Sequence, residues 1–318
     1  MHLRWPLLIA LPFVGLTLAC GSGGDEERAT SSPTAVTRKV DVSKDDLGRT
    51  VAVPASPQRI VAMSPSVVEL LFAVGVTPVG RPSSADYPEA AKAVPHFGTS
   101  YQPNYEEIAA MKPDLIIADA VIHKDTVADL ARLGAPVWAV RVNSFDDVTA
   151  GLRKVGALTG RQEAAEREAK KLEDQLAGIL AKKPATSPSV IVVVAGGPTQ
   201  LFAGLNDSYV GDILKRLGAR NVLSNEPETF RLPGFSDYSI ERIVEKNPDV
   251  IIAISPGRPN ITTQAMSASP VYGSLKAVKE GRVHEVDPVI YLQAAGPRVS
   301  LILDELARIL YPDVFKAS

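Results

Sequence analysis

The segment YEEIAAMKPDLIIA at residues 105–118 recurs in the second half of the chain as YSIERIVEKNPDVIIA at residues 238–253. Each copy starts with a helical pattern, reaches a Pro-Asp step that ends a helix, and continues into an aliphatic run typical of a buried strand. A helix followed at once by a buried strand is a building unit of α/β sheets. The recurrence of this unit predicts an internal duplication.

The units upstream of these segments also follow one plan. The β-branched run at 59–63, a Ser-Pro-Ser turn and a helical pattern at 67–74 predict a strand, a turn and a helix. A strand at 190–194, a Gly-Gly-Pro loop and a helix at 209–217 repeat this order. The predicted fold class is therefore α/β, with parallel strands and crossover helices in each of two lobes and a ligand cleft between the lobes.

A long helix is predicted between the two halves. Residues 161–183 read RQEAAEREAKKLEDQLAGILAKK, a run of strong helix formers before Pro184. At 1.5 Å per residue this helix is about 34 Å long, enough to run along both lobes and fix their separation. We expect an N-terminal α/β lobe at 38–160, a bridging helix at 161–184 and a C-terminal α/β lobe at 185–318.

The globular part is predicted to begin with a hairpin. Residues 38–53, RKVDVSKDDLGRTVAV, alternate apolar and polar side chains on both sides of Asp45-Asp46-Leu47-Gly48. This alternation around a turn with glycine at a positive-φ position is typical of two paired strands. We expect the pair to act as a lid.

The first residues have the layout of a secretory signal. Residues 1–19 carry one arginine near the start, an apolar run interrupted by prolines, and a small residue before Cys20. Leu16-Thr17-Leu18-Ala19-Cys20 resembles a bacterial lipobox, although Thr17 stands where leucine is usual. This resemblance implies cleavage after residue 19 and lipidation of Cys20. Residues 20–37, rich in Gly, Ser, Thr and charge, have the composition of a flexible tether.

Composition excludes several classes of protein. The chain has 318 residues, 45% of them hydrophobic, and a formal net charge of −2. A charge this close to zero, without a basic cluster, gives no electrostatic attraction for nucleic acid. Because the chain contains one cysteine, a disulfide framework and a multi-cysteine zinc site are both excluded.

An ordered series of short motifs over residues 40–312 resembles the family of iron-siderophore, haem and cobalamin substrate-binding proteins of ABC transporters. The motifs are Arg59–Ser66, Glu69–Leu71, Gly75, Gly80, Asp86–Pro88, Asn104–Ala118, Leu133–Val137, Leu217–Val222, Leu275–Val283 and Gly296–Arg298. The resemblance implies two Rossmann-like lobes joined by a rigid helix, with a small closure motion. It also implies that the ligand is a transported metal chelate rather than a resident cofactor, and that the partner is an ABC importer permease.

In that family an exposed glutamate on each lobe docks into arginine pockets of the permease. The matching positions are Glu69 and Glu241. Each falls near the first turn of a predicted helix, where the helix dipole favours a carboxylate that can accept bidentate arginine contacts. The alternative is that each glutamate only stabilises the start of its helix.

The ligand-contact candidates are polar and aromatic residues expected on loops after strands, where a flat or greasy chelate would bind. They are Ser64, Tyr101, Gln102, Phe202, Phe235, Tyr238 and Tyr291. His96 and His123 are candidate haem-iron ligands, but two histidines without a third ligand at matched spacing make a weak metal site. We therefore expect no metal site in the protein itself.

Two other functions stay open. One is a secreted two-lobe α/β hydrolase, but the chain lacks a Gly-x-Ser-x-Gly elbow, a phosphate-binding Gly-x4-Gly-Lys-Ser/Thr loop, a Gly-x-Gly-x-x-Gly turn and a His-Glu-x-x-His motif. The other is a metal-binding lipoprotein without a transport partner. We expect a monomeric binding protein, not an enzyme, held outside the cytoplasm by a lipid anchor.

Overall fold

The computed structural model describes residues 40–197, 200–223, 226–229 and 231–316. The predicted signal peptide, the tether and Cys20 lie outside these ranges. Across the ranges that are described, the structure contains no helix with both the length and the apolarity to cross a membrane.

The first half of the chain forms a parallel sheet. Its strands are β1 (Ile60–Ala62), β2 (Leu115–Asp119) and β3 (Val137–Val140), in the order β1-β2-β3. All three strands are fully buried, as expected of a parallel sheet covered on both faces. The helices of this half are α1 (Pro65–Ala73), η1 (Glu89–Ala93), α2 (Tyr105–Ala110), α3 (Val127–Ala131) and α4 (Phe145–Thr159). The strand-turn-helix unit predicted here is confirmed.

The second half forms a larger, mixed sheet. Its strands are β4 (Ser189–Ala195), β5 (Leu201–Gly204), β6 (Arg220–Asn221), β7 (Phe235–Tyr238), β8 (Val250–Ile254) and β9 (Val283–Val286). The order is β7-β5-β4-β8-β9, with β6 also paired to β4. Because β5 is antiparallel to both β4 and β7, the prediction of a wholly parallel sheet is wrong for this half. The turn after β4 is too short for a crossover helix, so the next strand must run antiparallel.

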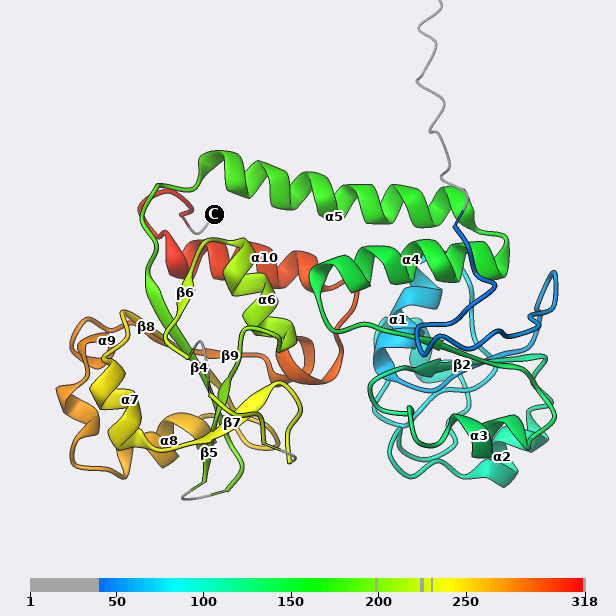
Figure 1. The fold of residues 1–318 in the computed structure, drawn as a ribbon, viewed down its shortest axis with the longest axis horizontal. Helices are drawn as coiled ribbons and strands as arrows, with labels where there is room; N and C mark the ends of the chain where they lie inside the picture. Colours follow the sequence, from blue (N-terminus) through cyan, green and yellow to red (C-terminus); the bar gives the residue numbers. More distant parts are fainter. Residues whose placement is uncertain (1–39, 198–199, 224–225, 230, 317–318) are drawn as a thin grey trace, which may run out of the picture. The chain divides into compact units, whose positions relative to one another are not determined.

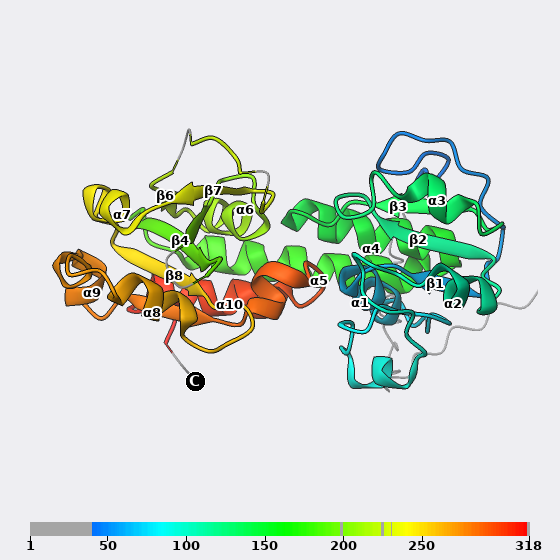
Figure 2. The same cartoon turned by 90° about the horizontal axis from the view of Figure 1, so that it is seen from below.

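Helices cover the second sheet and join it to the first. They are α6 (Tyr209–Arg216), α7 (Ile240–Lys246), α8 (Ile261–Ser267), η2 (Tyr272–Ser274), α9 (Lys276–Lys279), η3 (Val289–Gln293) and α10 (Val299–Leu310), with the predicted long helix present as α5 (Gln162–Lys182). Figures 1 and 2 both show α5 lying beside α4 and α10, and these helix pairs are in contact. The predicted domain boundaries remain predictions, although α5 does lie between the two sheets in sequence.

The repeated Pro-Asp step makes the same contacts twice. The Asp114 N–H donates to the Arg59 carbonyl (2.9 Å), and the Asp114 carboxylate accepts from the Arg59 N–H (2.9 Å). In the second half, the Asp249 N–H donates to the Ser189 carbonyl (3.0 Å), and its carboxylate accepts from the Ser189 N–H (2.8 Å). Each aspartate thus ties the start of one central strand, β2 or β8, to the start of its neighbour. The predicted structural repeat is confirmed at these positions.

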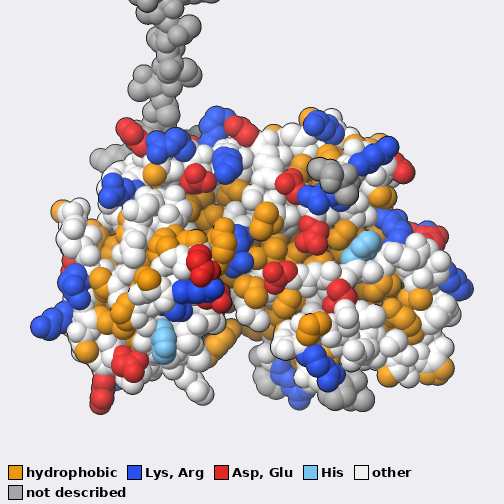
Figure 3. All heavy atoms as spheres, turned by 180° about the vertical axis from the view of Figure 1, so that it is seen from behind, with side chains coloured by type: hydrophobic (Ala, Val, Ile, Leu, Met, Phe, Trp, Pro, Cys, Tyr) orange, Lys and Arg blue, Asp and Glu red, His pale blue; other side chains and the backbone are white. Residues whose placement is uncertain are grey.

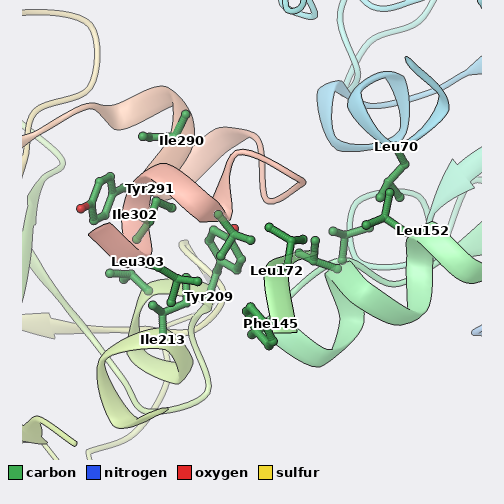
Figure 4. Close-up of a cluster of buried hydrophobic side chains, with 14 of the residues drawn as sticks. Leu70, Phe145, Leu152, Leu172, Tyr209, Ile213, Ile290, Tyr291, Ile302 and Leu303 are labelled. Carbon is green, nitrogen blue, oxygen red and sulfur yellow. The ribbon is translucent and has the colours of Figure 1, made fainter. Parts of the chain in front are cut away.

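One hydrophobic cluster contains residues of both halves. Figure 4 shows part of it, with Leu70 and Leu152 from the first half, Leu172 on α5, and Tyr209 and Leu303 from the second half. Helices α1, α4, α5, α6 and α10 all contribute buried side chains to this cluster. Because interiors of this kind are close-packed, a large separation of the two sheets would open a cavity at α5. The packing of this shared cluster therefore links the two halves in addition to the connection through α5.

The predicted hairpin is wrong in its details. Lys44 and Thr50 form an isolated antiparallel bridge around a turn in which Gly48 has φ of 78°, but no strands extend from it. The buried Asp45 carboxylate accepts instead from the Ala139 N–H of β3 (3.2 Å). Because its polar groups are used against the edge of the first sheet, this segment is not a lid.

Candidate functional site

In the first half, polar side chains gather where β1 and β2 end. Ser64 follows β1, Asp119 is the last residue of β2, and His123 lies on the loop after it. In open α/β sheets ligands bind at the carboxyl ends of the strands. This edge is therefore the first-half part of the candidate site.

Asp119 is buried and is held by the turn that follows it. Its carboxylate accepts from the N–H groups of Val121 (2.8 Å) and Ile122 (3.2 Å). Burial raises the pKa of Asp119, and these two hydrogen bonds, the His123 ring and the Ser64 hydroxyl act in the opposite direction. The side chain fixes the backbone at the end of β2 and does not face solvent.

His123 is also buried, with both ring nitrogens used inside the protein. Nδ1 accepts from the Asp119 N–H (3.1 Å), and Nε2 lies 3.0 Å from the Ser100 carbonyl oxygen. A ring nitrogen bonded in this way cannot ligate a metal, so the haem-iron role considered for His123 is wrong. His96 is exposed, and across the described residues no three His, Cys, Asp or Glu side chains form a group able to hold a metal ion.

The loop that His123 contacts presents two of the predicted ligand residues to solvent. Tyr101 is 80% exposed, and Gln102 is also exposed. A tyrosine phenol ordinarily titrates near pH 10, so the phenol of Tyr101 is neutral at physiological pH and can stack on a ligand or donate a hydrogen bond to it.

The second half contributes a pocket at the carboxyl ends of β8 and β9. Its volume is about 390 Å³, and its polar lining includes Ser255, Arg258, Asn260, Glu285 and Gln293. The Glu285 carboxylate accepts from the Ser255 hydroxyl (2.7 Å) and from the Thr263 N–H (3.2 Å). A volume in the range of about 300–1,000 Å³ with a few polar groups is typical of small-molecule sites. None of these residues is among the predicted ligand contacts.

The four aromatic candidates of the second half are buried instead. Phe202 and Tyr238 lie in β5 and β7, Phe235 begins β7, and Tyr291 lies in η3, where its hydroxyl donates to Glu305 (2.9 Å). Their exposed fractions are 6%, 8%, 3% and 1% in that order. Their expected placement on loops after strands is wrong, because β5 and β7 contain Phe202, Phe235 and Tyr238, and η3 contains Tyr291. Their role as ligand contacts stays a prediction. Ser64 is likewise buried and caps α1 through a hydrogen bond from the Val67 N–H (3.3 Å).

The two predicted docking glutamates differ in their surroundings. Glu241 is exposed in the first turn of α7. Glu69 is 3% exposed, and its carboxylate accepts from Nε and Nη2 of Arg298. The expectation that Glu69 is exposed is therefore wrong, since an arginine of the same chain already occupies its carboxylate.

Charge is evenly mixed on the face drawn in Figure 3, where acidic and basic side chains alternate around hydrophobic ones. This agrees with the net charge of −2. The surface thus gives no strong field of one sign on this face, and recognition there depends on local contacts.

Comparison with known proteins identifies the family. A family model described as periplasmic binding protein matches residues 60–290. The chain belongs to the periplasmic binding protein family. Among curated family relatives, it is 27% identical to the uncharacterized ABC transporter substrate-binding lipoprotein YvrC of Bacillus subtilis, over 99% of this chain and 100% of the relative.

Two further comparisons place the chain among periplasmic binding proteins. It is 28% identical to the probable siderophore-binding lipoprotein YfiY of Bacillus subtilis, over 94% of this chain and 95% of the relative. The crystal structure of a periplasmic haem-binding protein from Pseudomonas aeruginosa superposes with a TM-score of 0.70 at 24% identity, covering 82% of this chain and 95% of that one. The last likeness shows that the two-lobe α/β fold is shared.

Several residues of this candidate site were not selected by the sequence analysis. His123 was considered only as a metal ligand, and the pocket residues Arg258, Asn260 and Gln293 were not considered. The signal for the pocket was available, because these residues follow the aliphatic strands at 250–254 and 283–286. No sequence signal pairs Glu69 with Arg298, which lie at opposite ends of the chain.

Proposed function

We propose that this protein is an extracytoplasmic, lipid-anchored solute-binding protein that captures a metal chelate and delivers it to an ABC importer. An iron-siderophore complex or cobalamin is favoured over haem as the chelate. The observation that carries the binding role is Tyr101, an aromatic side chain left 80% exposed at the carboxyl edge of the first sheet. A phenol at this edge can stack on a flat ligand and donate a hydrogen bond to it, and ligands of open α/β sheets bind at the carboxyl ends of the strands.

The pocket in the second half supports the same role. Arg258, Asn260 and Gln293 offer hydrogen-bond donors to an oxygen-rich ligand at the carboxyl edge of the second sheet. Haem is less favoured, because haem iron needs an axial histidine, tyrosinate, methionine or cysteine thiolate. Both ring nitrogens of His123 are hydrogen-bonded inside the protein, and a tyrosine phenol is ordinarily neutral at physiological pH.

Titration of the detergent-extracted full chain with ferric siderophores, cobalamin and haem tests the binding role. We expect saturable one-to-one binding of one of these chelates, without covalent change to it. Mass spectrometry of the chelate recovered after binding checks the second point. Failure of every chelate to bind with saturation would contradict the proposal, and turnover of the ligand would favour an enzyme.

The anchor is proposed at Cys20, in line with the lipoprotein names of the two Bacillus subtilis relatives. Replacement of Cys20 by serine removes the thiol that would carry the lipid, so the variant is expected in the soluble fraction outside the cytoplasm. Cell fractionation followed by immunoblotting measures this. Unchanged retention of C20S in the membrane fraction would show that another segment anchors the chain.

Delivery is proposed to use the exposed Glu241 as a permease contact. Glu69 can take the same role only where Arg298 releases its carboxylate, because a carboxylate filled by one bidentate guanidinium has little capacity for a second. We propose that the protein acts as a monomer.

A further inference from the structure

His123 connects two separate backbone segments through its ring. The Asp119 N–H at the end of β2 points at Nδ1, and the Ser100 carbonyl oxygen lies beside Nε2. Because an N–H donates to Nδ1, that nitrogen has no proton, and the neutral ring must carry its proton on Nε2. Nε2 therefore donates to the Ser100 carbonyl. The ring is 2% exposed, which prevents water from replacing either contact.

Ser100 belongs to a closed loop, residues 98–103, which we name the Tyr101 loop. At its base, Gly98 and Pro103 form an isolated antiparallel bridge, and the Asn104 N–H donates to the Phe97 carbonyl (2.7 Å). Inside the loop, the Gln102 N–H donates to the Thr99 hydroxyl (3.0 Å). Near the tip, the contact with His123 joins the loop to the edge of the first sheet.

The residue after Ser100 is the exposed Tyr101. Among the residues that the structure describes, the buried Ser100 hydroxyl has no hydrogen-bond partner, whereas the Ser100 carbonyl bonds to His123. Loss of that contact would leave the tip of the loop without its hydrogen bond to the edge of the first sheet. A rigid aromatic side chain binds a ligand at lower cost in conformational entropy than a mobile one.

We propose that His123 is a positioning residue for ligand binding, which holds the Tyr101 loop so that the tyrosine ring forms a fixed contact surface for a chelate with a flat, conjugated face. This inference rests on the proposed binding function. A flat conjugated face suits an exposed aromatic ring, because offset stacking of two π-systems adds to the area that they bury.

The same contacts make the loop sensitive to acid. Protonation of His123 would place an N–H at Nδ1, facing the Asp119 N–H, and two donors cannot bond each other. The charged group that acts on His123 is the Asp119 carboxylate, which favours protonation, while burial of the ring lowers its pKa by a larger effect. The loop is therefore expected to loosen, and the ligand to bind more weakly, only as pH falls below the ordinary pKa of histidine, about 6.5.

Two matched variants separate the contacts of the ring. An asparagine oxygen can take the place of Nδ1, so His123→Asn keeps the acceptor for the Asp119 N–H but loses the bond to Ser100. A glutamine amide can reach the place of Nε2, so His123→Gln keeps the donor to the Ser100 carbonyl. A purely structural role predicts that both variants behave alike at equal stability, whereas the positioning role predicts that only H123N affects the loop and the ligand.

The first measurement needs no ligand. Hydrogen exchange of the full chain is followed at the Gln102 amide, with the Asn104 amide at the base of the loop and the amides of α5 as internal references. We expect exchange in H123N to be at least about tenfold faster than in the wild type, and in H123Q to stay within about threefold. Equal exchange in both variants would overturn the positioning role.

The second measurement uses whichever of haem, cyanocobalamin, a ferric trihydroxamate and a ferric tricatecholate binds the wild type. We expect H123N to bind it about tenfold more weakly, and H123Q to bind within about threefold and without the loss of affinity below pH 6. Equal affinity of H123N and wild type would overturn the inference. If no probe binds the wild type, the proposed function fails, and the exchange measurement still decides whether His123 positions the loop.

Discussion

Arg298 donates from Nε to both carboxylate oxygens of Glu69, at 3.0 Å each, and so joins the start of α10 to α1. The Arg298 guanidinium also lies 4.3 Å from the centre of the Tyr87 ring. Gly296 permits this approach, because a Cβ at that position would lie 3.2 Å from Oε2 of Glu69. The two halves of the chain are thus linked by a buried ion pair in addition to α5.

Removing one partner of this pair is expected to destabilise the fold. The side chain of Glu69 is 2% exposed and that of Arg298 is 14% exposed. Arg298→Leu therefore leaves a carboxylate buried without a cation, which costs about 3–5 kcal/mol in the free energy of unfolding. Glu69→Leu is expected to cost less, because the freed guanidinium can still reach water. Urea unfolding measures both.

The double variant E69L/R298L checks that the cost comes from an uncompensated charge. It is expected to be more stable than R298L alone, since replacing both charges removes the desolvation penalty. Lys170→Ala is the surface control, because the Lys170–Asp174 pair is more than 60% exposed on both sides and is worth about 0.2–1 kcal/mol. A double variant as unstable as the sum of the singles would contradict this reasoning.

Asp114 and Asp249, the aspartates of the two Pro-Asp steps, should each stabilise the fold through the hydrogen bonds that they accept. Asp249→Ala leaves the N–H of the buried Ser189 without its acceptor, at a cost of about 1–3 kcal/mol, whereas Asp114→Ala frees the N–H of the exposed Arg59, at a cost of about 0.5–1.5 kcal/mol. Asp249→Ala is expected to cost more, because its carboxylate also accepts from Lys276 and from the Ser189 hydroxyl. Thermal or urea unfolding of the two variants tests this. An unchanged stability in either variant would show that the contact does not hold its strand.

Asp249 also makes stability sensitive to acid. Burial raises its pKa, but the hydrogen bonds from Lys276 and Ser189 outweigh burial and hold the pKa below the ordinary value of an aspartate. Its contribution is therefore full above the unfolded pKa, about 3.9, and is lost as pH falls through the lower folded value. The difference in unfolding free energy between wild type and D249N should shrink with falling pH only below about pH 4.

Protonation of His123 is expected to lower the free energy of unfolding at a higher pH than protonation of Asp249 does. Burial lowers its pKa, so the unfolded chain binds more protons than the folded chain just below about pH 6.5. Its contribution is full above that pH and is lost as pH falls. Asp119, whose pKa is raised by burial, acts in the opposite direction as it takes up a proton. Unfolding of wild type and H123Q at about pH 7.5 and 5.5 should show a larger loss in the wild type.

Glu241 offers a test of delivery that does not disturb ligand binding. Glu241→Ala is expected to reduce uptake by at least about tenfold, since loss of one partner of an interface charge pair costs about 2–5 kcal/mol. Ligand affinity and melting temperature should stay close to wild type, because Glu241 is exposed. Glu245→Ala on the same helix is the matched control, and equal uptake by both variants would remove Glu241 from the docking surface.

Tyr101 and Tyr291 separate ligand contact from core packing. Tyr101→Ala is expected to weaken chelate binding by about tenfold and to leave stability unchanged, because the side chain is 80% exposed. Tyr291→Phe should do the reverse, since it removes the hydrogen bond to Glu305 from a residue that is 1% exposed. Its cost is about 1 kcal/mol in stability. Isothermal titration and urea unfolding of both variants check these outcomes.

Local patterns in the sequence determined the elements of this protein. The helix at 162–182, the strands at 115–119 and 250–254, and the two Pro-Asp steps all follow from periodicity and from residues that stop helices. Such signals act between residues a few positions apart, so they appear in the sequence without knowledge of the fold. Tyr101 and Gln102 lie exposed on a loop, where the sequence analysis expects them.

Only the tertiary structure decided which polar and aromatic side chains are available to a ligand or a partner. Phe202, Phe235 and Tyr238 are buried because β5 and β7 add antiparallel strands to the second sheet. Glu69 is covered by Arg298, and His123 is bonded at both nitrogens, through contacts between distant segments. Burial and pairing depend on what packs against a side chain, and no local pattern contains that information.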